Sequence, residues 1–574
     1  MAAHFKATKR EMVDQTAGTP PAFLPKLVTT LAEGYGPRQL RADLLAGLTV
    51  AIVALPLSMA IAIASGVPPE RGLYTAIVGG FCVSALGGSR FQIGGPAGAF
   101  IVLVAATVQA HGLEGLILAT ILSGFLLVAA GVLRLGTFVK FIPYPVTVGF
   151  TAGIAAIIFA SQLVPLLGLT LPGKEPGPLL DKLPALWAAL PTLRPATVAL
   201  SLASVAALLA LKKLRPHWPR MLVVVALASL VAWALGLDVA TIGTAFGGIP
   251  DGLPAPHLPA MDWAKVQAVL PVAFSFALLG SIESLLSAVV ADGMTGRHHR
   301  SNTELVAQGV ANVASGLFGG FCVTGTIART ATNVRAGAHG PVAGIAHSLF
   351  LLLFILVAAP LAAYIPLAAL AAVLALVAWD MVEKPAFATL LRASWGDATV
   401  LLVTLGLTLF RDLSEAIVVG FALGAVLFIH RMAQAVSVEE RPRGPYREEG
   451  ADPQAVVFRV TGAMFFGAVS AVGAALDRIG DGHRLLVVDL SGVTLVDSSA
   501  ANMIETLARK ARRQGVALYV AGAAAPLRRA LLAHGARPPL VRYAPSSDAA
   551  LAGARRRGVL ANPAPGAAEA EARP

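Results

Sequence analysis

The chain has 574 residues, of which 56% are hydrophobic and 13% charged, and its formal net charge is +12. Soluble proteins average about 25% charged residues, and a mean hydropathy of +0.73 is typical of a protein that crosses a membrane many times. On a soluble chain this basic excess would suggest nucleic-acid binding. Here the positive-inside bias of membrane proteins explains it better, so we expect no nucleic-acid partner.

Residues 1–42 predict a cytoplasmic tail. Basic residues such as Lys6 and Lys26 lie on a polar stretch, and the first long apolar run begins only near Leu44. This order does not fit a cleavable signal peptide.

Residues 43–435 predict a transmembrane domain of about twelve to fourteen segments, many near the ~20 residues that span hydrocarbon. Lys212, Arg220 and Arg297 fall in loops on one side, and an even number of spans returns the C-terminus to the cytoplasm. The predicted segments are roughly 43–64, 70–86, 96–110, 113–134, 145–167, 195–212, 219–236, 268–291, 303–318, 325–336, 340–360, 364–380, 396–410 and 412–432.

Two of these segments are too short and too polar for ordinary membrane helices. One begins with GGSRFQIGGPAGAF at Gly87 and the other with GGFCVTGTIARTATN at Gly319. Interrupted segments at matching positions of two halves indicate the substrate site of an inverted-repeat transporter. A half-helix that starts inside the membrane presents free N–H groups and about half a positive charge, which suits an anion. Kinked or re-entrant helices with purely structural glycines are the alternative.

Two charged residues interrupt membrane sequence. Arg329 lies about one turn into the second half-helix, where an arginine costs about 2.5–3.5 kcal/mol even on the mildest insertion scale. We expect it to face a cavity and meet an anion or an acidic partner; an arginine that snorkels to the interface is the alternative. Glu283 lies in an apolar helix with Ser287 one turn further on. It either changes protonation, pairs with Arg329 or simply hydrogen-bonds within the bundle.

The other charged residues near these segments do not indicate a binding site. Asp292, Glu304 and the pair Arg297 and Arg300 lie near a membrane end, and we interpret them as ordinary loop charge.

The pentapeptide GGFCV occurs at Gly79–Val83 and at Gly319–Val323 and contains both cysteines. Free cysteines in apolar surroundings behave as small hydrophobic residues. We therefore expect Cys82 to pack in the core and Cys322 to lie on the extended segment close to the anion site, with no metal and no disulfide framework. No catalytic motif is present, so an enzyme is not expected.

After Arg431 the composition changes. Residues 436–454 predict a charged linker and residues 455–555 a small α/β domain, with strands at VVFRVTG, LLVVDLSG and Val516–Val520. Helices are predicted at Val469–Arg478 and Ala500–Gln514, and residues 556–574 predict a disordered tail.

Several motifs together resemble the SulP family of anion transporters, in its bacterial branch. They are GLTVAIVALPLSMAIAIASGVPPERGLY, GGSRFQIGGPAGAF, GTIARTATN and, in the small domain, LSGVTLVDSSAAN. The resemblance covers nearly the whole chain. It implies about fourteen membrane segments as two inverted repeats of seven, as in the uracil-permease-like fold, with a core domain that moves against a gate domain in an elevator-like cycle. It also implies a homodimer in the bacterial inner membrane with both termini cytoplasmic.

The resemblance further implies a binding shell from three segments and a coupling pair from a fourth. The substrate-binding residues would be Pro56, Leu57, Ser58 and Met59 of the first segment, Gly95, Pro96, Ala97 and Gly98 of the third, and Gly325, Thr326, Ile327 and Arg329 of the tenth. Glu283 and Ser287 of the eighth would be the ion-coupling residues. Many relatives carry Gln where this chain has Leu57, which leaves the substrate open among bicarbonate, sulfate and a dicarboxylate.

The resemblance also implies the mode of ion coupling and the type of the soluble domain. Glu at position 283 favours proton symport, whereas relatives with Asp resemble sodium-coupled bicarbonate carriers; exchange is a third mode. No cofactor is expected besides the coupling ion, H⁺ or Na⁺. The C-terminal domain resembles the sulfate transporter and anti-sigma factor antagonist (STAS) domain, with Ser499 at the position that antagonist relatives phosphorylate and with a cytoplasmic partner as another role.

Two other functions stay open at this point. A nucleobase–proton symporter of the same fold would need an acidic residue in the tenth segment, where this chain has Arg329. A membrane-tethered signalling protein would act through the soluble domain and would not need a charged, interrupted membrane core.

Overall fold

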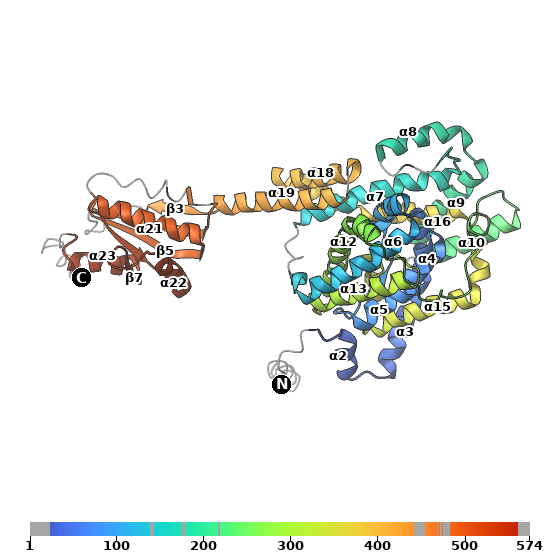
Figure 1. Ribbon diagram of the computed structural model, residues 1–574, viewed down its shortest axis with the longest axis horizontal. Coiled ribbons are helices and arrows are strands. Elements are labelled where there is room, and N and C mark those ends of the chain that lie inside the picture. Colours follow the sequence, from blue (N-terminus) through green and yellow to red (C-terminus); the bar gives the residue numbers. More distant parts are fainter. Residues whose placement is uncertain are drawn as a thin grey trace. The chain divides into compact units, whose positions relative to one another are not determined.

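The computed structural model describes residues 23–137, 143–173, 176, 179–215, 218–411, 413–440, 454–467, 469–470, 473 and 483–560. The chain divides into two compact units, Met1–Phe421 and Ala422–Pro574, and we describe each by itself (Figure 1). The predictions for residues 1–22, for residues 441–453, for most of the helix at 469–478 and for residues 561–574 lie outside the described residues.

The first unit is helical, and each of the fourteen predicted segments corresponds to a helix or a helical run. In chain order these are α3 (Pro37–Ala64), α4 (Pro69–Tyr74) with α5 (Gly80–Leu86), α6 (Ile101–Val132), α7 (Tyr144–Leu167), α9 (Pro195–Leu214), α10 (Arg220–Ala234), α12 (Trp263–Thr295), α13 (Ser301–Leu317), α14 (Ile327–Arg335), α15 (Val342–Ala362), α16 (Leu367–Met381), α18 (Trp395–Phe410) and α19 (Leu413–Gln434). Within the described residues, seven helices are long and apolar enough to cross a membrane, and two shorter ones are similarly apolar.

The third and fourth predicted segments form one continuous helix, α6, with a break in it. Gly112 has a φ of 67° inside α6 and divides it at the predicted boundary. Shorter helices that we did not predict are α2 (Lys26–Ala32), α8 (Leu179–Ala189), α11 (Ile242–Phe246) and α17 (Lys384–Ala393).

Helix α13 packs along α6 through glycines (Figure 1). A Cβ atom added at Gly309 would lie 2.5 Å from the carbonyl oxygen of Gly124, and one added at Gly124 would lie 2.6 Å from the carbonyl oxygen of Gly309. Small residues therefore allow the two backbones to approach, as is common between membrane helices.

The second unit contains a five-stranded sheet in the order β3-β4-β5-β6-β7. Its strands are β3 (Ser437–Glu440), β4 (Ala455–Met464), β5 (Leu485–Val496), β6 (Ala517–Ala521) and β7 (Arg542–Ala544). β3 runs antiparallel to β4, and the other neighbours are parallel. Part of the predicted linker is thus a strand, because Ser437–Glu440 pairs with the edge of the sheet.

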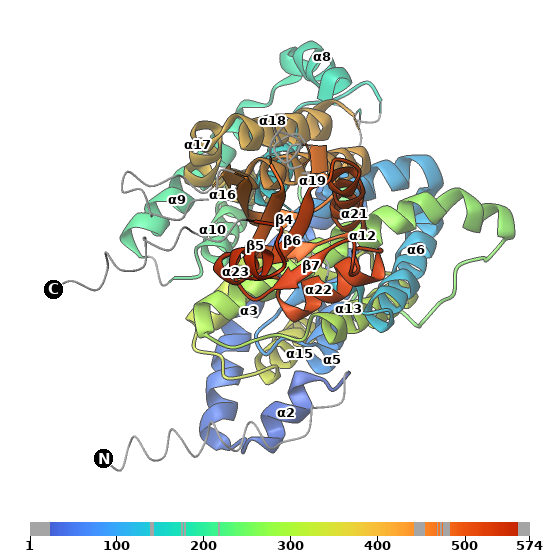
Figure 2. The same ribbon diagram turned by 90° about the vertical axis from the view of Figure 1, so that its left-hand side faces the viewer.

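The sheet of the second unit lies between α21 (Ser498–Arg513) and α23 (Ser547–Arg556), as Figure 2 shows. Strand β5 alternates its side chains: Leu486 and Val488 pack in the cluster that holds α21 and α22 (Ala525–Ala533), while Leu485 and Val487 pack toward α23. This period of two is what a strand buried on both faces requires.

Candidate functional site

The two extended segments that precede the half-helices cross each other inside the first unit. β1 (Gly94–Gly95) pairs antiparallel with β2 (Thr324–Gly325), with Gly94 opposite Gly325 and Gly95 opposite Thr324. A Cβ atom at Gly95 would overlap Nη1 of Arg329, and one at Gly325 would overlap the side chain of Gln92. The crossing therefore requires glycine at both positions.

A half-helix begins directly after each extended segment. The turn Gly98–Phe100 leads into α6, and α14 begins at Ile327. Ala97 and Thr326, the residues before the first turns, are extended and make no side-chain cap. The first N–H groups of both half-helices consequently have no partner within the helix, and both ends carry positive partial charge.

Arg329 lies where these elements meet and is 1% exposed. Its Nη2 donates to Ser58 Oγ at 3.1 Å and to the carbonyl oxygen of Pro96 at 3.2 Å. Its Nε and Nη1 are buried without a hydrogen-bond partner. Pairing with Glu283, one of the predicted alternatives, is not observed: the described part of the chain offers Arg329 no carboxylate.

The residues predicted from the first segment lie on α3, where Pro56, Leu57, Ser58 and Met59 are all buried. Of these, Ser58 contacts the guanidinium of Arg329, whereas Leu57 and Met59 belong to the hydrophobic core of the unit. The structure thus brings one residue of each predicted segment, Ser58, Pro96 and Arg329, into direct contact.

Three residues at the starts of the half-helices are not buried. Ile327 is 37% exposed and Ala328 is exposed as well, while Gly98 across the crossing is partly exposed. The remaining predicted residues of the third and tenth segments, Gly95, Pro96, Ala97, Gly325 and Thr326, are buried.

Glu283 and Ser287, the predicted coupling pair on α12, have different surroundings. Glu283 is partly exposed, and no hydrogen bond or ion pair joins it to any described residue. Ser287 is fully buried and donates to Thr330 Oγ1 at 3.1 Å, which in turn accepts from the backbone N–H of Ile93 at 3.1 Å. Ser287 is therefore engaged in holding the first extended segment against α14.

Our interpretation of Glu304 as loop charge is wrong. Its side chain is fully buried on α13 and accepts hydrogen bonds from the N–H groups of Gly88 and Ser89 and from the amides of Gln92 and Gln308. The signal in the sequence is a polar stripe at Glu304, Gln308, Asn312 and Ser315, whose spacing of four, four and three places it on one helical face. The prediction of loop charge rests on the nearness of Glu304 to GRHHR and takes no account of this spacing.

Both cysteines are free. Cys82 is partly buried and packs at the edge of the cluster formed by Val83, Ala311 and Val323, in agreement with the expected packing role. Cys322 lies on the second extended segment, but it is 1% exposed and its Sγ lies 3.6 Å from Thr120 Oγ1 of α6. Its side chain therefore packs against α6.

In the second unit, Ser499 is exposed in the first turn of α21. Asp497 caps this helix by accepting from the N–H of Ala500 at 2.8 Å, and its other oxygen accepts from the N–H of Phe466 at 2.9 Å. The hydroxyl of Ser499 is thus accessible at a helix N-terminus, where a phosphate is favourable.

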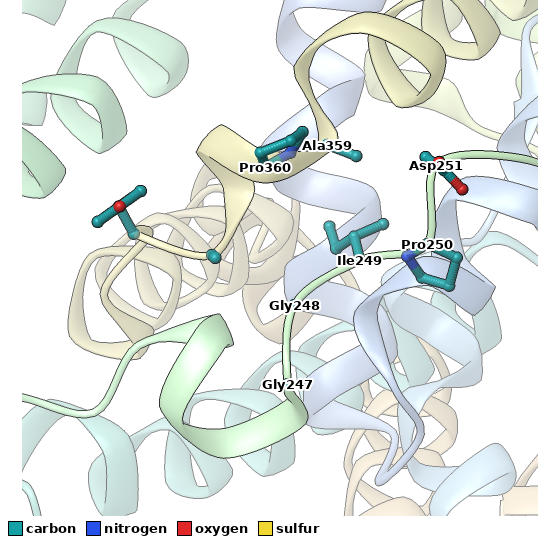
Figure 3. Close-up of a pocket in the computed structure, with 9 residues that line it drawn as sticks. Gly247, Gly248, Ile249, Pro250, Asp251, Ala359 and Pro360 are labelled. Carbon is teal, nitrogen blue, oxygen red and sulfur yellow. The ribbon is translucent and has the colours of Figure 1, made fainter.

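A separate pocket of about 510 Å³ lies between the loop Gly247–Asp251 and the end of α15. Figure 3 shows Ile249, Pro250 and Asp251 on this loop beside Ala359 and Pro360. No basic side chain lines it, and none of the predicted site residues does. The pocket therefore has no cationic side chain to balance the charge of an anion.

Comparison with known proteins gives consistent matches. Residues 40–404 match the model of the sulfate permease family, and residues 448–548 match that of the STAS domain. The chain is 38% identical over 492 residues to "Putative sulfate transporter YvdB" of Bacillus subtilis, covering 85% of this chain and 93% of that protein. It is 32% identical over 521 residues to the bicarbonate transporter BicA of Picosynechococcus sp., covering 86% of this chain and 90% of that protein.

Two solved structures are similar. The transmembrane domain of a cyanobacterial BicA is 33% identical, with a TM-score of 0.59, over 68% of this chain and 98% of that one. The murine Slc26a9 anion transporter in its inward-facing state has a TM-score of 0.82 over 94% of this chain and 96% of that one. At 20% identity, the second likeness concerns the fold alone.

Proposed function

The chain belongs to the sulfate permease family and carries a STAS domain, and from this premise we propose that it is a secondary active transporter of a small anion. The anion binds where the crossing segments end, between the starts of α6 and α14. The multi-pass helical unit is the transporter, and no enzymatic activity is part of the proposal.

The observation that carries this proposal is the guanidinium of Arg329. It is almost completely buried, yet two of its nitrogens have no partner, and no carboxylate among the described residues balances its charge. A buried cation without a counter-charge is strongly unfavourable. An anion at the adjacent helix N-termini would neutralise it and accept the unused N–H donors.

The substrate class follows from this chemistry. The site offers a cation, backbone N–H groups and the hydroxyl of Ser58, all of which suit a compact oxyanion such as bicarbonate, sulfate or a small dicarboxylate. Relatives named for sulfate and for bicarbonate support this range. Apolar Leu57 beside Ser58 leaves fewer polar contacts from α3.

We assign coupling to protons through Glu283, with sodium symport and anion exchange as the alternatives. Among the described residues Glu283 has no hydrogen-bond or ion-pair partner that would fix its protonation state, and it lies on the helix that contacts β2 through the Thr324–Gly280 hydrogen bond of 3.2 Å. An elevator-like movement of the site against the remaining helices, a homodimer in the bacterial inner membrane with cytoplasmic termini, and a cytoplasmic partner at the STAS domain complete the proposal.

The test is uptake into proteoliposomes that contain the purified full-length protein. Labelled bicarbonate, sulfate and fumarate are offered with an inward proton gradient, with an inward sodium gradient and with neither. The proposal expects accumulation of at least one anion driven by the proton gradient without sodium. Failure of every anion under every gradient would overturn the proposed function, and accumulation driven only by sodium would replace proton coupling with the sodium alternative.

A further inference from the structure

We infer that α13 is a clamp that holds the two half-helices at a fixed spacing and thereby sets which anions fit. The inference rests on the proposed function and concerns its specificity. It assigns positioning roles to Glu304 and Asn312, two residues of the buried polar stripe on α13.

Glu304 holds the first extended segment. Oε2 accepts from the backbone N–H groups of Gly88 at 2.8 Å and Ser89 at 3.0 Å, and Oε1 accepts from Gln92 Nε2 at 2.9 Å and Gln308 Nε2 at 3.0 Å. Four donors fill the approximately four lone-pair positions of one carboxylate. Both oxygens of the Glu304 side chain are thus occupied, one by backbone N–H groups and the other by side-chain amides.

The same donors connect Glu304 to the crossing. Gln92 Nε2 also donates to Ser284 Oγ of α12 at 2.7 Å, and its side chain fills the space where a Cβ at Gly325 would lie. The start of the segment is anchored as well, because the N–H of Arg300 donates to the carbonyl of Gly88 at 2.9 Å. Displacing Glu304 therefore displaces β1 relative to β2.

Asn312 and Ser315 hold the second extended segment from the same helix. Asn312 Nδ2 donates to the carbonyl of Val323 at 2.9 Å, and its Oδ1 accepts from the N–H of Val323 at 3.0 Å. Ser315 Oγ donates to the carbonyl of Phe321 at 2.8 Å. The side-chain amide of Asn312 thus pairs with the backbone of Val323 in the way that a neighbouring strand would. Val323 lies one residue before β2.

Because α13 contacts both segments and also packs through glycines against α6, the parts of the site form one rigid body. α6 continues the first half-helix, and α14 is joined to the first segment by Asn333, whose Nδ2 donates to the carbonyl of Phe91 at 2.9 Å. In such a body the distance between the two helix N-termini is fixed by the lengths of side chains on α13. That distance limits the size of the anion that both ends contact together.

Two nearly isosteric substitutions test the clamp in the full-length protein. Glu304→Gln places an amide among four donors, and Asn312→Leu leaves both backbone groups of Val323 unpaired. For each we expect the KM for the preferred anion to rise about tenfold, the equivalent of one lost hydrogen bond to a charged or buried group. We also expect the uptake ratio among chloride, bicarbonate and sulfate to change, because the spacing changes.

Ser123→Ala is the matched control. Ser123 is 1% exposed on α6 and donates only to the carbonyl of Thr120 in its own helix, at 2.7 Å. Its loss should lower the amount of folded protein at most, and leave KM and the anion ratio unchanged. If Glu304→Gln does not fold, Gln308→Ala serves instead, because it removes one of the four donors. It should raise the KM and change the anion uptake ratio in the same direction, but less.

Hydrogen exchange gives a readout that does not need transport. Glu304→Gln should speed exchange of the Gly88 and Ser89 amides, and Asn312→Leu that of Val323, each about tenfold or more. One outcome would overturn the inference that α13 sets the spacing. In it, the wild-type protein transports anions, the variants reduce the uptake of every anion by the same factor, and these amides stay protected from exchange. If wild type transports none, the proposed function fails while the exchange result still decides whether α13 holds the segments.

Discussion

Arg329 and Glu304 are both buried charges in the membrane unit, and the difference between them lies in their partners. Glu304 has a donor at each acceptor position, whereas Arg329 has unused donors and no counter-charge. The sequence predicted that Arg329 is functional because arginine is costly in a membrane. It did not separate Glu304 from loop charge, because its donors come from Gly88 and Ser89, more than two hundred residues away.

At the scale of single residues, the prediction about ion coupling concerns the side chain of Glu283. Glu283→Gln keeps the shape of the side chain but cannot release a proton, so accumulation driven by a pH gradient should be lost while exchange of substrate across the membrane continues. Proteoliposome uptake with and without the gradient measures both. Glu114→Gln, at an exposed carboxyl near the break in α6, should leave the driven uptake intact; driven uptake by Glu283→Gln itself would remove Glu283 from the coupling role.

Asp489 in the second unit gives a pH prediction. Burial by itself raises the pKa of this carboxyl, but hydrogen bonds from Ser491 and Ser547 and the charge of Arg459 outweigh burial, and its pKa lies below the ordinary value. A carboxyl whose pKa is lowered by folding stabilises the fold above its unfolded pKa of about 3.9 and loses this contribution as the pH falls.

Asp489→Asn should therefore lower the free energy of unfolding of the second unit by about 1–3 kcal/mol at pH 7. The deficit should shrink below about pH 4. Urea titrations of the full-length protein followed by pulse proteolysis measure it, with exposed Glu439→Gln as the control. A deficit that stays constant down to acid pH would contradict the ionic role.

At the scale of elements, the sequence pattern predicted the position of a helix or helical run at each of the fourteen segments, and seven of the described helices are long and apolar enough to cross a membrane. What it could not give is the crossing of β1 and β2, since Gly94 and Gly325 are far apart in the chain and a two-residue strand leaves no periodic signal. The family resemblance placed Ser287 in the coupling pair, and the structure adds that its hydroxyl donates to Thr330 Oγ1. Both features are contacts between segments that are distant in the chain.

The close pairing of β1 with β2 predicts that a methyl group added at Gly95 reduces anion uptake. In Gly95→Ala the new Cβ would overlap Nη1 of Arg329, so the guanidinium must leave its position. We expect anion uptake per folded protein to fall about tenfold or more. Gly406→Ala on α18, where a Cβ would meet nothing within 4 Å, is the control in proteoliposome assays. Unchanged uptake by Gly95→Ala would show that the position of Arg329 does not matter.

At the scale of the whole molecule, the helical unit and the STAS unit are separate compact bodies with their own cores. All residues of the proposed anion site belong to the first unit, and we therefore predict that uptake does not depend entirely on the second. Removing residues 437–574 should leave a measurable part of the anion uptake, and gradient dependence should be retained. Complete loss of uptake by a truncated protein that is folded and inserted would contradict a site that works without the STAS unit.

The anion site itself is tested most directly by Arg329→Ala, with Arg335→Ala as the matched control at the exposed end of the same helix. Uptake of the preferred anion into proteoliposomes, normalised to folded protein, is the measurement. We predict that Arg329→Ala reduces uptake about ten- to a hundredfold, as expected for the loss of charge-assisted hydrogen bonds, and that Arg335→Ala stays near wild type. Uptake by Arg329→Ala at the wild-type rate would contradict an anion site built around this guanidinium.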